Sequence, residues 1–204
     1  ALIGQERVMT GPEAGTTRDA IAVKWDHGGR SLRLVDTAGL RRKARITDEV
    51  EKMATGDTLR AIRLAQIVIL VLDARTPLEK QDLTIADHIV DEGRGLVIAL
   101  NKWDLIENKE ETLRNFRDEL ERSLGQLPDV PFVTISALHG ANTKKLLDRV
   151  VETYDLWAAR IKTSKMNRWL AARESQNPPP LAAGRANRLR YITQIKAKPP
   201  TFAL

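Results

Sequence analysis

The sequence of 204 residues contains no cysteine. This absence excludes a disulfide framework and any thiolate metal site, and it makes a reducing compartment the simplest expectation. Long apolar runs are also missing, because the longest, Ile67–Leu72, is far shorter than the roughly 18 residues that a membrane-spanning helix needs. No charged-then-apolar leader opens the sequence. We therefore expect a cytoplasmic protein with no membrane partner.

Acidic residues are scarce in the last quarter of the sequence. From Trp157 onward there are ten Lys or Arg residues and one acid, Glu174, which leaves 23 basic against 26 acidic residues before that point. The overall net charge of +6 therefore comes from the C-terminal segment. A basic segment suggests a polyanionic partner, most simply RNA or DNA, and a solvated cationic face is the alternative that charge alone leaves open.

Up to about Tyr154 the sequence alternates short β-branched runs with longer stretches of helical period, the pattern of βαβ units around a mostly parallel sheet. Runs that are apolar on both faces predict central strands at Ile67–Leu72, Gly95–Leu100 and Pro131–Ile135. The alternating runs Ile21–Trp25 and Ser31–Val35 predict an antiparallel pair joined at His27–Gly29. Apolar residues at three- and four-residue spacing predict helices at Thr55–Ala65, Lys80–Glu92, Glu110–Leu124 and Thr143–Arg160. The expected fold class is α/β.

A second structural unit is expected to begin after Ser164. A short helix, Met166–Glu174, runs into Asn177–Pro180, a stiff break that no helix or central strand can contain. Two strands around a Pro-Pro turn are predicted at the end, Leu189–Lys196 and the segment from Pro199. The sequence stops without a closing turn or cap, so we expect this second unit to be truncated.

A carboxylate directly follows the predicted strand at Ser31–Val35. In the run Asp36–Gly39 (DTAG), the aspartate would project from the carboxyl end of the sheet, the edge at which α/β sheets bind ligands. Mg²⁺ is normally held through water or one carboxylate plus nucleotide phosphates, and the glycine lets a backbone N–H approach the terminal phosphate. We expect Asp36 to associate with magnesium, although an aspartate turn after a strand is common.

A second polar run, Asn101–Asp104 (NKWD), follows the second predicted central strand. The carboxylate of Asp104 can accept two hydrogen bonds from the N1–H and exocyclic N2–H₂ of guanine, which adenine cannot offer, while Asn101 and the Lys102 stem fix the loop and cover the base. Ser136–Leu138 (SAL) follows the third strand and offers a backbone N–H toward guanine O6. The three runs in this order, each after a strand, are hard to obtain by chance and predict a guanine-nucleotide site.

The polar segment Gly15–Asp19 (GTTRD) precedes the first alternating strand. In a GTPase a mobile loop at this point supplies a threonine to Mg²⁺ and the terminal phosphate, and it orders only in the triphosphate state. We select Thr17 for this role, and a Gly-Thr-Thr turn into a strand is the alternative.

The runs GTTRD, DTAGL, NKWD and SAL, in this order, resemble the bacterial Era/Der-type GTPases. The run Asp36–Arg45 (DTAGLRRKAR) is similar to the second GTPase domain of the Der (EngA) family, which carries two tandem G domains and a KH-like domain and is implicated in assembly of the large ribosomal subunit. The resemblance covers essentially the whole chain, because it continues through Ser164–Asn167, Pro178–Pro180 and Leu189–Tyr191 to Pro199–Phe202, which is similar to the KH-like domain.

The resemblance implies a P-loop NTPase-type, mostly parallel sheet with helices on both faces over residues 1–160, followed by a truncated α+β KH-like domain over residues 161–204. It implies GTP and GDP with Mg²⁺ as ligands, hydrolysis of GTP, and the large ribosomal subunit and its RNA as partners, in cis with another G domain. Thr17 and Asp36 are predicted to bind the metal. The residues predicted to bind GTP are Asp36, Thr37, Ala38, Gly39, Leu40, Asn101, Lys102, Trp103, Asp104, Ser136, Ala137 and Leu138.

The family's phosphate-binding loop, GxxxxGK(S/T), would lie upstream of Ala1. We therefore expect the chain to lack the first strand and that loop and to be inactive alone. We also expect instability in isolation, because a parallel sheet without a central strand exposes unpaired backbone groups. Ras-like enzymes orient the attacking water with a glutamine just after DxxG, where this sequence has Leu40, so no general base is named. The resemblance implies that a potassium ion supplies part of the missing positive charge.

Two alternatives to this interpretation stay open: a nucleotide-free RNA-binding or scaffold module with a degenerate G domain, and a GTPase of the same superfamily with another target. The C-terminal segment contains no GxxG, with which KH modules clamp a nucleic-acid backbone, so sequence-specific RNA binding is not expected. The three histidines, His27, His88 and His139, are interpreted as ordinary surface or loop residues. The tryptophans other than Trp103 are interpreted as packing residues.

Overall fold

A computed structural model gives the fold of the protein and describes residues 22–35, 55–125, 127, 129–179 and 188–204. The chain divides into two compact units, Ala1–Thr153 and Tyr154–Leu204. The sequence placed the division between the two domains at residue 160.

The first unit is built on a three-stranded parallel sheet of β3 (Ile67–Asp73), β4 (Gly95–Asn101) and β5 (Phe132–Thr134), in the order β3-β4-β5. The register pairs Ile67 with Gly95 and Asp73 with Asn101, so β3 and β4 start and end together. All three strands predicted from apolar runs are present as parallel strands, and within the described residues only β4 has a neighbouring strand on both sides. Because the strands are parallel, the loops that follow them all leave at the same edge of the sheet.

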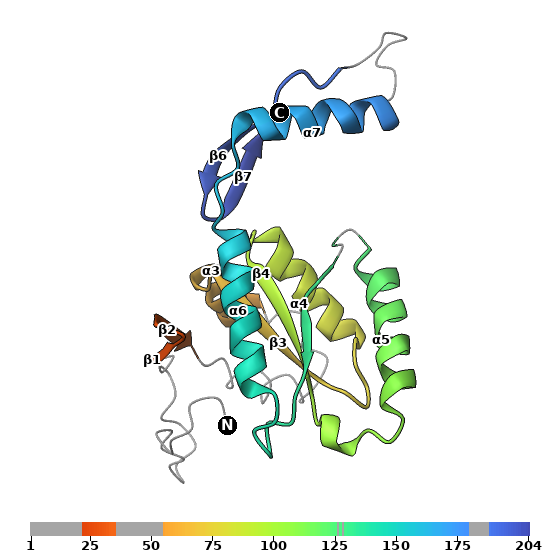
Figure 1. Ribbon diagram of the computed structural model, residues 1–204. Coiled ribbons are helices and arrows are strands. Elements are labelled where there is room, and N and C mark those ends of the chain that lie inside the picture. Colours follow the sequence, from red (N-terminus) through yellow and green to blue (C-terminus); the bar gives the residue numbers. More distant parts are fainter. Residues whose placement is uncertain (1–21, 36–54, 126, 128, 180–187) are drawn as a thin grey trace. The chain divides into compact units, whose positions relative to one another are not determined.

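Helices cover both faces of this sheet (Figure 1). Alternate side chains of β4 point to opposite faces, as the two-residue period of a strand requires. Leu96, Ile98 and Leu100 pack with residues of α4 (Lys80–Asp91) and α5 (Lys109–Ser123). Val97 and Ala99 pack with Leu146 of α6 (Thr143–Trp157). The predicted α/β class, with a sheet covered on both faces, is therefore confirmed.

Strand β3 is less buried than its apolar sequence predicts. The first six of the seven residues of β4 are buried, whereas Val71 of β3 is 38% exposed. Within the described residues β3 pairs with β4 alone, so it has one hydrogen-bonded neighbour where β4 has two. The prediction of a central position for β3 does not hold within the described residues, because an apolar run shows what a strand can bury and not how many neighbours it has.

An antiparallel hairpin precedes the sheet in sequence. Strands β1 (Ala22–His27) and β2 (Arg30–Val35) are joined by Gly28 and Gly29, whose φ angles are +57° and +77°. Two successive positive φ angles make a type I′ turn, which glycine adopts without steric cost. His27 therefore lies at the end of β1 and not in the turn, and its Nε2 is 2.7 Å from Asp148 Oδ1 of α6. The interpretation of His27 as an ordinary surface or loop residue was wrong.

The remaining helix of the first unit is α3 (Thr55–Leu64), which contributes Ile62 to the cluster on the α4 side of the sheet. A single turn of 3₁₀ helix, η1 (Trp103–Leu105), follows β4. Of the helices in the described residues, none combines the length and the apolar character needed to cross a membrane.

The second unit contains α7 (Thr163–Gln176) and an antiparallel pair, β6 (Thr193–Ala197) and β7 (Pro200–Ala203). Met166 and Leu170 of α7 pack against Ile192 in a small core. The side chain of Asn167 accepts a hydrogen bond from the Ile192 N–H at 3.0 Å and donates one to its carbonyl oxygen at 3.0 Å. This amide fastens the segment that enters β6 to the helix.

Candidate functional site

The loop after β4 lies at the carboxyl edge of the parallel sheet. Asn101 is the last residue of β4, and Lys102 adopts a left-handed backbone with φ +64° before η1 begins at Trp103. A left-handed conformation is uncommon for a residue with a side chain and is held only where surrounding contacts require it. The turn at Lys102 places the start of η1, including Asp104, directly beyond the strand end.

The loop after β5 leaves from the same edge. Ser136 is buried, with 3% of its surface exposed, and it forms an isolated antiparallel bridge with Ala141. Its hydroxyl accepts a hydrogen bond from the His139 N–H at 3.3 Å, which closes a tight turn. Leu138, at the tip of that turn, is 83% exposed. An apolar side chain held out from an ordered loop is available to contact a planar ligand.

Hydrogen bonds join the two loops. The Ala137 N–H donates to Asn101 Oδ1 at 2.9 Å, and the Trp103 N–H donates to the Ile135 carbonyl oxygen at 3.1 Å. Residues that are 36 positions apart in the sequence are thus fixed against each other. The structure brings together all the described residues that the sequence assigned to guanine recognition, which are Asn101, Lys102, Trp103, Asp104, Ser136, Ala137 and Leu138.

Asp104 carries the charge of this site. The hydroxyl of Ser136 donates to its carboxylate, and this is the largest of the interactions that lower the pKa of Asp104 below its ordinary value. The imidazole of His139, with Nε2 3.9 Å from Asp104 Oδ2, lowers that pKa further. Asp104 is therefore an ionised carboxylate at neutral pH. An ionised carboxylate only accepts hydrogen bonds, so it suits a ligand edge that offers donors.

A second carboxylate, Asp73, lies at the end of the neighbouring strand. Its oxygen Oδ2 accepts from Lys102 Nζ at 2.6 Å and from Arg75 Nη2 at 2.6 Å, and Oδ1 accepts from Arg75 Nε at 3.0 Å. Hydrogen bonds from the Arg75 side chain have the largest effect on the pKa of Asp73 and hold it well below its usual range, and the hydrogen bond from Lys102 lowers it further. Lys102, in the loop after β4, is thus bound to the neighbouring strand β3.

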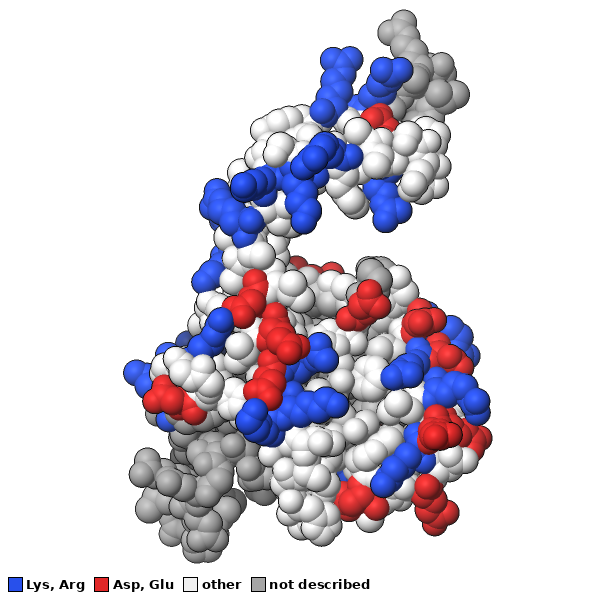
Figure 2. All heavy atoms as spheres, in the orientation of Figure 1, with Lys and Arg blue, Asp and Glu red and all other residues white. Residues whose placement is uncertain are grey.

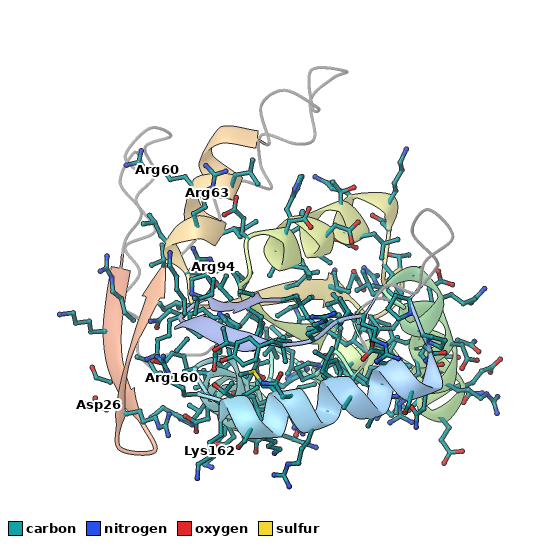
Figure 3. The ribbon with its side chains drawn as sticks, turned by 90° about the horizontal axis from the view of Figure 1, so that it is seen from above. Asp26, Arg60, Arg63, Arg94, Arg160 and Lys162 are labelled. Carbon is teal, nitrogen blue, oxygen red and sulfur yellow. The ribbon has the colours of Figure 1, made fainter. Side chains whose placement is uncertain are left out.

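The opposite edge of the sheet carries a group of arginines (Figure 3). Arg60 and Arg63 lie on α3, and Arg63 Nε donates to Glu92 Oε1 at 2.7 Å. Arg94 precedes β4, and its Nε is buried with no hydrogen-bond partner among the described residues. This group lies away from the motif-bearing loops, because it sits where the strands begin and not where they end.

The other predicted site residues lie outside the described residues. They are Thr17, Asp36, Thr37, Ala38, Gly39 and Leu40. Both predicted magnesium ligands are among them. Within the part of the chain that the structure describes, no group of three or more His, Cys, Asp or Glu side chains could hold a metal ion.

Sequence reasoning missed two residues of this edge, Asp73 and His139. His139 was interpreted as an ordinary loop residue, whereas it approaches the carboxylate of Asp104. Asp73 carried one signal that could have identified it, because an acidic residue ends an apolar strand at the sheet edge that carries the other motifs. Its contact with Lys102 depends on strand register and could not be read from the sequence.

Family models match both parts of the chain. Residues 1–102 match the family described as 50S ribosome-binding GTPase. Residues 160–204 match the KH-domain-like of EngA bacterial GTPase enzymes, C-terminal. The chain belongs to the Der (EngA) family of GTPases. The resemblance of its motifs to that family is therefore confirmed.

Relatives named GTPase Der align with the whole chain. The chain is 53% identical over 204 residues to GTPase Der of Mesorhizobium japonicum and 49% identical over 203 residues to that of Parvibaculum lavamentivorans. Each alignment covers 100% of this chain and 43% of the relative. The chain thus spans less than half the length of these Der proteins.

Solved structures share the fold at low sequence identity. Era in complex with MgGDPNP and nucleotides 1506-1542 of 16S ribosomal RNA aligns with a TM-score of 0.54 and 20% identity over 74% of this chain and 50% of that chain. A single-residue variant of Aquifex aeolicus Era bound to GDP.AlF4- aligns with a TM-score of 0.50 and 21% identity over 70% of this chain and 47% of that chain. These likenesses agree with the α/β fold.

Proposed function

We propose that the chain is the guanine-nucleotide-binding part of an enzyme that hydrolyses GTP to GDP and phosphate and acts in assembly of the large ribosomal subunit. The observation that carries the nucleotide part is the junction of the two loops, in which Asn101 accepts from the Ala137 N–H and Ser136 donates to the ionised carboxylate of Asp104. The Der family assignment supports the hydrolytic part.

The donors and acceptors of the junction match the edge of guanine. Asp104 accepts from the N1–H and N2–H₂ groups, whereas adenine has an unprotonated N1 and no amino group at C2. The Ala137 N–H is already donated to Asn101, so we assign the Leu138 N–H as the donor to guanine O6. The exposed Leu138 side chain and the Lys102 stem cover the two faces of the base.

Hydrolysis and metal binding are proposed from the family and the motifs. Thr17 and Asp36 would hold Mg²⁺, which supplies positive charge next to the phosphates. Leu40 stands where a glutamine would orient water, so we assign no general base in this chain. A potassium ion near the phosphates, a cytoplasmic location and a second G domain in cis belong to the same proposal.

The ribosomal partner is supported by the charge of the second unit (Figure 2). Its described residues include nine Lys or Arg and two acids, Asp155 and Glu174. Trp169 and Tyr191, each 55% exposed, lie among these cations and offer aromatic faces to unpaired bases. The matching family is described as 50S ribosome-binding, and the Era structure contains ribosomal RNA.

A nucleotide-free RNA-binding or scaffold module is the second candidate. The same basic unit favours it, because that surface does not depend on the nucleotide loops. This candidate predicts RNA binding with no response to guanine nucleotides.

Binding of a fluorescent GDP analogue tests the proposal, with an ATP analogue as the control. It is measured on this chain and on a version extended upstream of Ala1 to include a GxxxxGK(S/T) sequence, called the extended version below. Tight binding of the GDP analogue by the extended version, with no binding of the ATP analogue, is the expected result. Failure of both proteins to bind GDP would contradict the proposal and leave the scaffold candidate.

A further inference from the structure

The carboxylate of Asp73 is fully occupied by donors from two directions. Oδ1 accepts from the backbone N–H and Nε of Arg75, and Oδ2 accepts from Arg75 Nη2 and Lys102 Nζ, at distances of 2.6–3.1 Å. A carboxylate that accepts bidentate hydrogen bonds from the planar guanidinium group of an arginine has a fixed orientation. Asp73 therefore presents a rigid acceptor to Lys102.

The backbone places the two partners side by side. Asp73 and Asn101 are paired in the register of β3 and β4, and the Ala74 N–H donates to the Asn101 carbonyl oxygen at 2.9 Å. The next residue, Lys102, turns into the left-handed region and sends its side chain back toward β3. The side chain of Lys102 is therefore anchored at its backbone by the turn and at its amine by Asp73.

The Lys102 anchor is not needed to neutralise Asp73. Arg75 alone supplies three of the four hydrogen bonds and a full positive charge. The side chains of Asp73 and Lys102 are 24% and 46% exposed, so an unpaired amine would be solvated at little cost. What the contact changes is the freedom of the lysine stem.

We propose that Asp73 is a positioning residue for guanine-nucleotide binding, which holds the stem of Lys102 in place to cover the base. The proposal rests on the proposed function, because it assumes that the loop after β4 receives guanine. A free lysine side chain has rotamer entropy that binding would have to remove. Because Asp73 already holds the Lys102 stem, much of this rotamer entropy is lost before the nucleotide binds.

The mechanism separates affinity from selectivity. The hydrogen-bond partners of Asp73 named above include neither Asp104 nor the loop after β5, so the hydrogen bonds that distinguish guanine from other bases stay intact when Asp73 is changed. A residue that only supported the fold would instead alter stability and selectivity together.

The test is a double-mutant cycle in the extended version, with Asp73→Asn, Lys102→Met and both, and with Asp87→Asn on the exposed face of α4 as the matched control. An exposed ion pair contributes little, so each single variant is expected to bind GDP only about two- to fivefold more weakly. The double variant should be no weaker than the weaker single variant, and the ratio of GDP to xanthosine diphosphate affinity should not change. Unchanged GDP binding in Asp73→Asn, or independent effects of the two substitutions, would overturn the proposal.

A second measurement, on the extended version without nucleotide, tests the contact itself. The ion pair must open before the Lys102 amine can be acetylated, so its labelling rate, followed by mass spectrometry, should rise about two- to fivefold in Asp73→Asn and stay unchanged in Asp87→Asn. Equal labelling in Asp73→Asn and the unmutated extended version would contradict the contact. If the unmutated extended version does not bind GDP, the proposed function is refuted. The labelling rates would still test the Asp73–Lys102 contact in that case.

Discussion

Ser136 gives the clearest case of a single side chain that prepares the site. It is almost fully buried, yet its hydroxyl both donates to the carboxylate of Asp104 and accepts from the His139 N–H. A small hydroxyl residue can satisfy both partners because it carries one donor and two acceptor lone pairs. Alanine fits the same space and satisfies neither.

Replacement of Ser136 by alanine should raise the pKa of Asp104 toward its ordinary value, because the hydrogen bond that stabilises the carboxylate is lost. The folded pKa is lowered in the parent chain, so ionisation of Asp104 persists to lower pH there than in the variant. A carbon-13 NMR titration of the Asp104 carboxyl should show its midpoint moving to higher pH in Ser136→Ala. A midpoint that does not move would show that Ser136 does not stabilise this charge.

Asn101 joins the two loops, so its loss should separate them. Asn101→Ala leaves the Ala137 N–H without its acceptor and should lower the free energy of unfolding by about 1–2 kcal/mol. Urea denaturation followed by circular dichroism measures this change, with Glu107→Ala on the exposed part of the following loop as the control. Equal stability of Asn101→Ala and the control would show that the loops do not depend on this bond.

The candidate site residues in the loops after β4 and β5 could be predicted because each motif follows an apolar strand. Parallel strands all end at the same edge of the sheet. Asn101, Asp104 and Ser136 were found in this way. The contacts of Asp73 with Lys102 at 2.6 Å and of His139 with Asp104 at 3.9 Å could not be predicted by the same reasoning, since they join separate loops. Neither residue type is unusual at its position in the sequence.

At the scale of elements, the β1–β2 hairpin is tied to α6 through one side-chain pair. His27 Nε2 and Asp148 Oδ1 are 2.7 Å apart, and Lys144 Nζ lies 3.1 Å from the other oxygen of Asp148. His27, first, and Lys144, second, lower the pKa of Asp148 by these hydrogen bonds. In the sequence the hairpin lies between Thr17 and Asp36.

Because the folded pKa of Asp148 is lowered, its contribution to stability is present above the unfolded pKa of about 3.9 and is lost as the pH falls through the folded value. Asp148→Asn should therefore lower the unfolding temperature at pH 6 and reduce its decline on acidification. Thermal unfolding of His27→Ala, Asp148→Asn and the double variant between pH 3 and 7 measures this. Independent effects of the two substitutions would contradict a direct pair.

The ends of a helix could be predicted where the apolar periodicity is strong. The prediction failed where tertiary contacts determine the end of the helix. The helix at Lys80–Asp91 was predicted to within one residue. Helix α6 ends at Trp157, three residues before the predicted end at Arg160, and α7 begins at Thr163, earlier than the predicted Met166.

Trp157 is buried as a packing residue should be, whereas Trp169 is 55% exposed, so the prediction that it packs was wrong. An aromatic on a helix indicates apolar surface and not which face is covered.

At the scale of the whole molecule, charge separates the two units. The second unit holds most of the unbalanced cations, and α7 presents Lys165, Arg168 and Arg173 around the exposed Trp169. A positive surface with an exposed aromatic favours single-stranded nucleic acid, because it combines phosphate attraction with base stacking.

The chain should bind single-stranded RNA in a salt-dependent manner through this unit. Arg168→Ala should weaken binding of single-stranded and duplex RNA alike, because it removes a phosphate contact. Trp169→Ala should weaken only single-stranded binding, by about 1–3 kcal/mol, because only unpaired bases stack. Fluorescence anisotropy with labelled oligonucleotides measures both, with Arg114→Ala on the exposed face of α5 as the control. Equal losses in Arg114→Ala and Arg168→Ala would show that the cations of the second unit have no special role.

The central claim is that the loops after β4 and β5 form one site that reads guanine through Asp104. In Asp104→Asn the side-chain oxygen can still accept from N1–H, but the side-chain NH₂ group faces C2 of the base. Guanine has an amino group at C2, which is also a donor and does not match. Xanthine has a carbonyl oxygen at C2, which accepts from the NH₂ group. The decisive measurement is the affinity of the extended version for GDP and for xanthosine diphosphate, before and after Asp104→Asn. We predict that GDP binding weakens about 100-fold while xanthosine diphosphate binding strengthens, since two charge-assisted hydrogen bonds are lost and a matched pair is gained. If Asp104→Asn leaves the order of the two affinities unchanged, the base is read elsewhere and the assignment of this site is wrong.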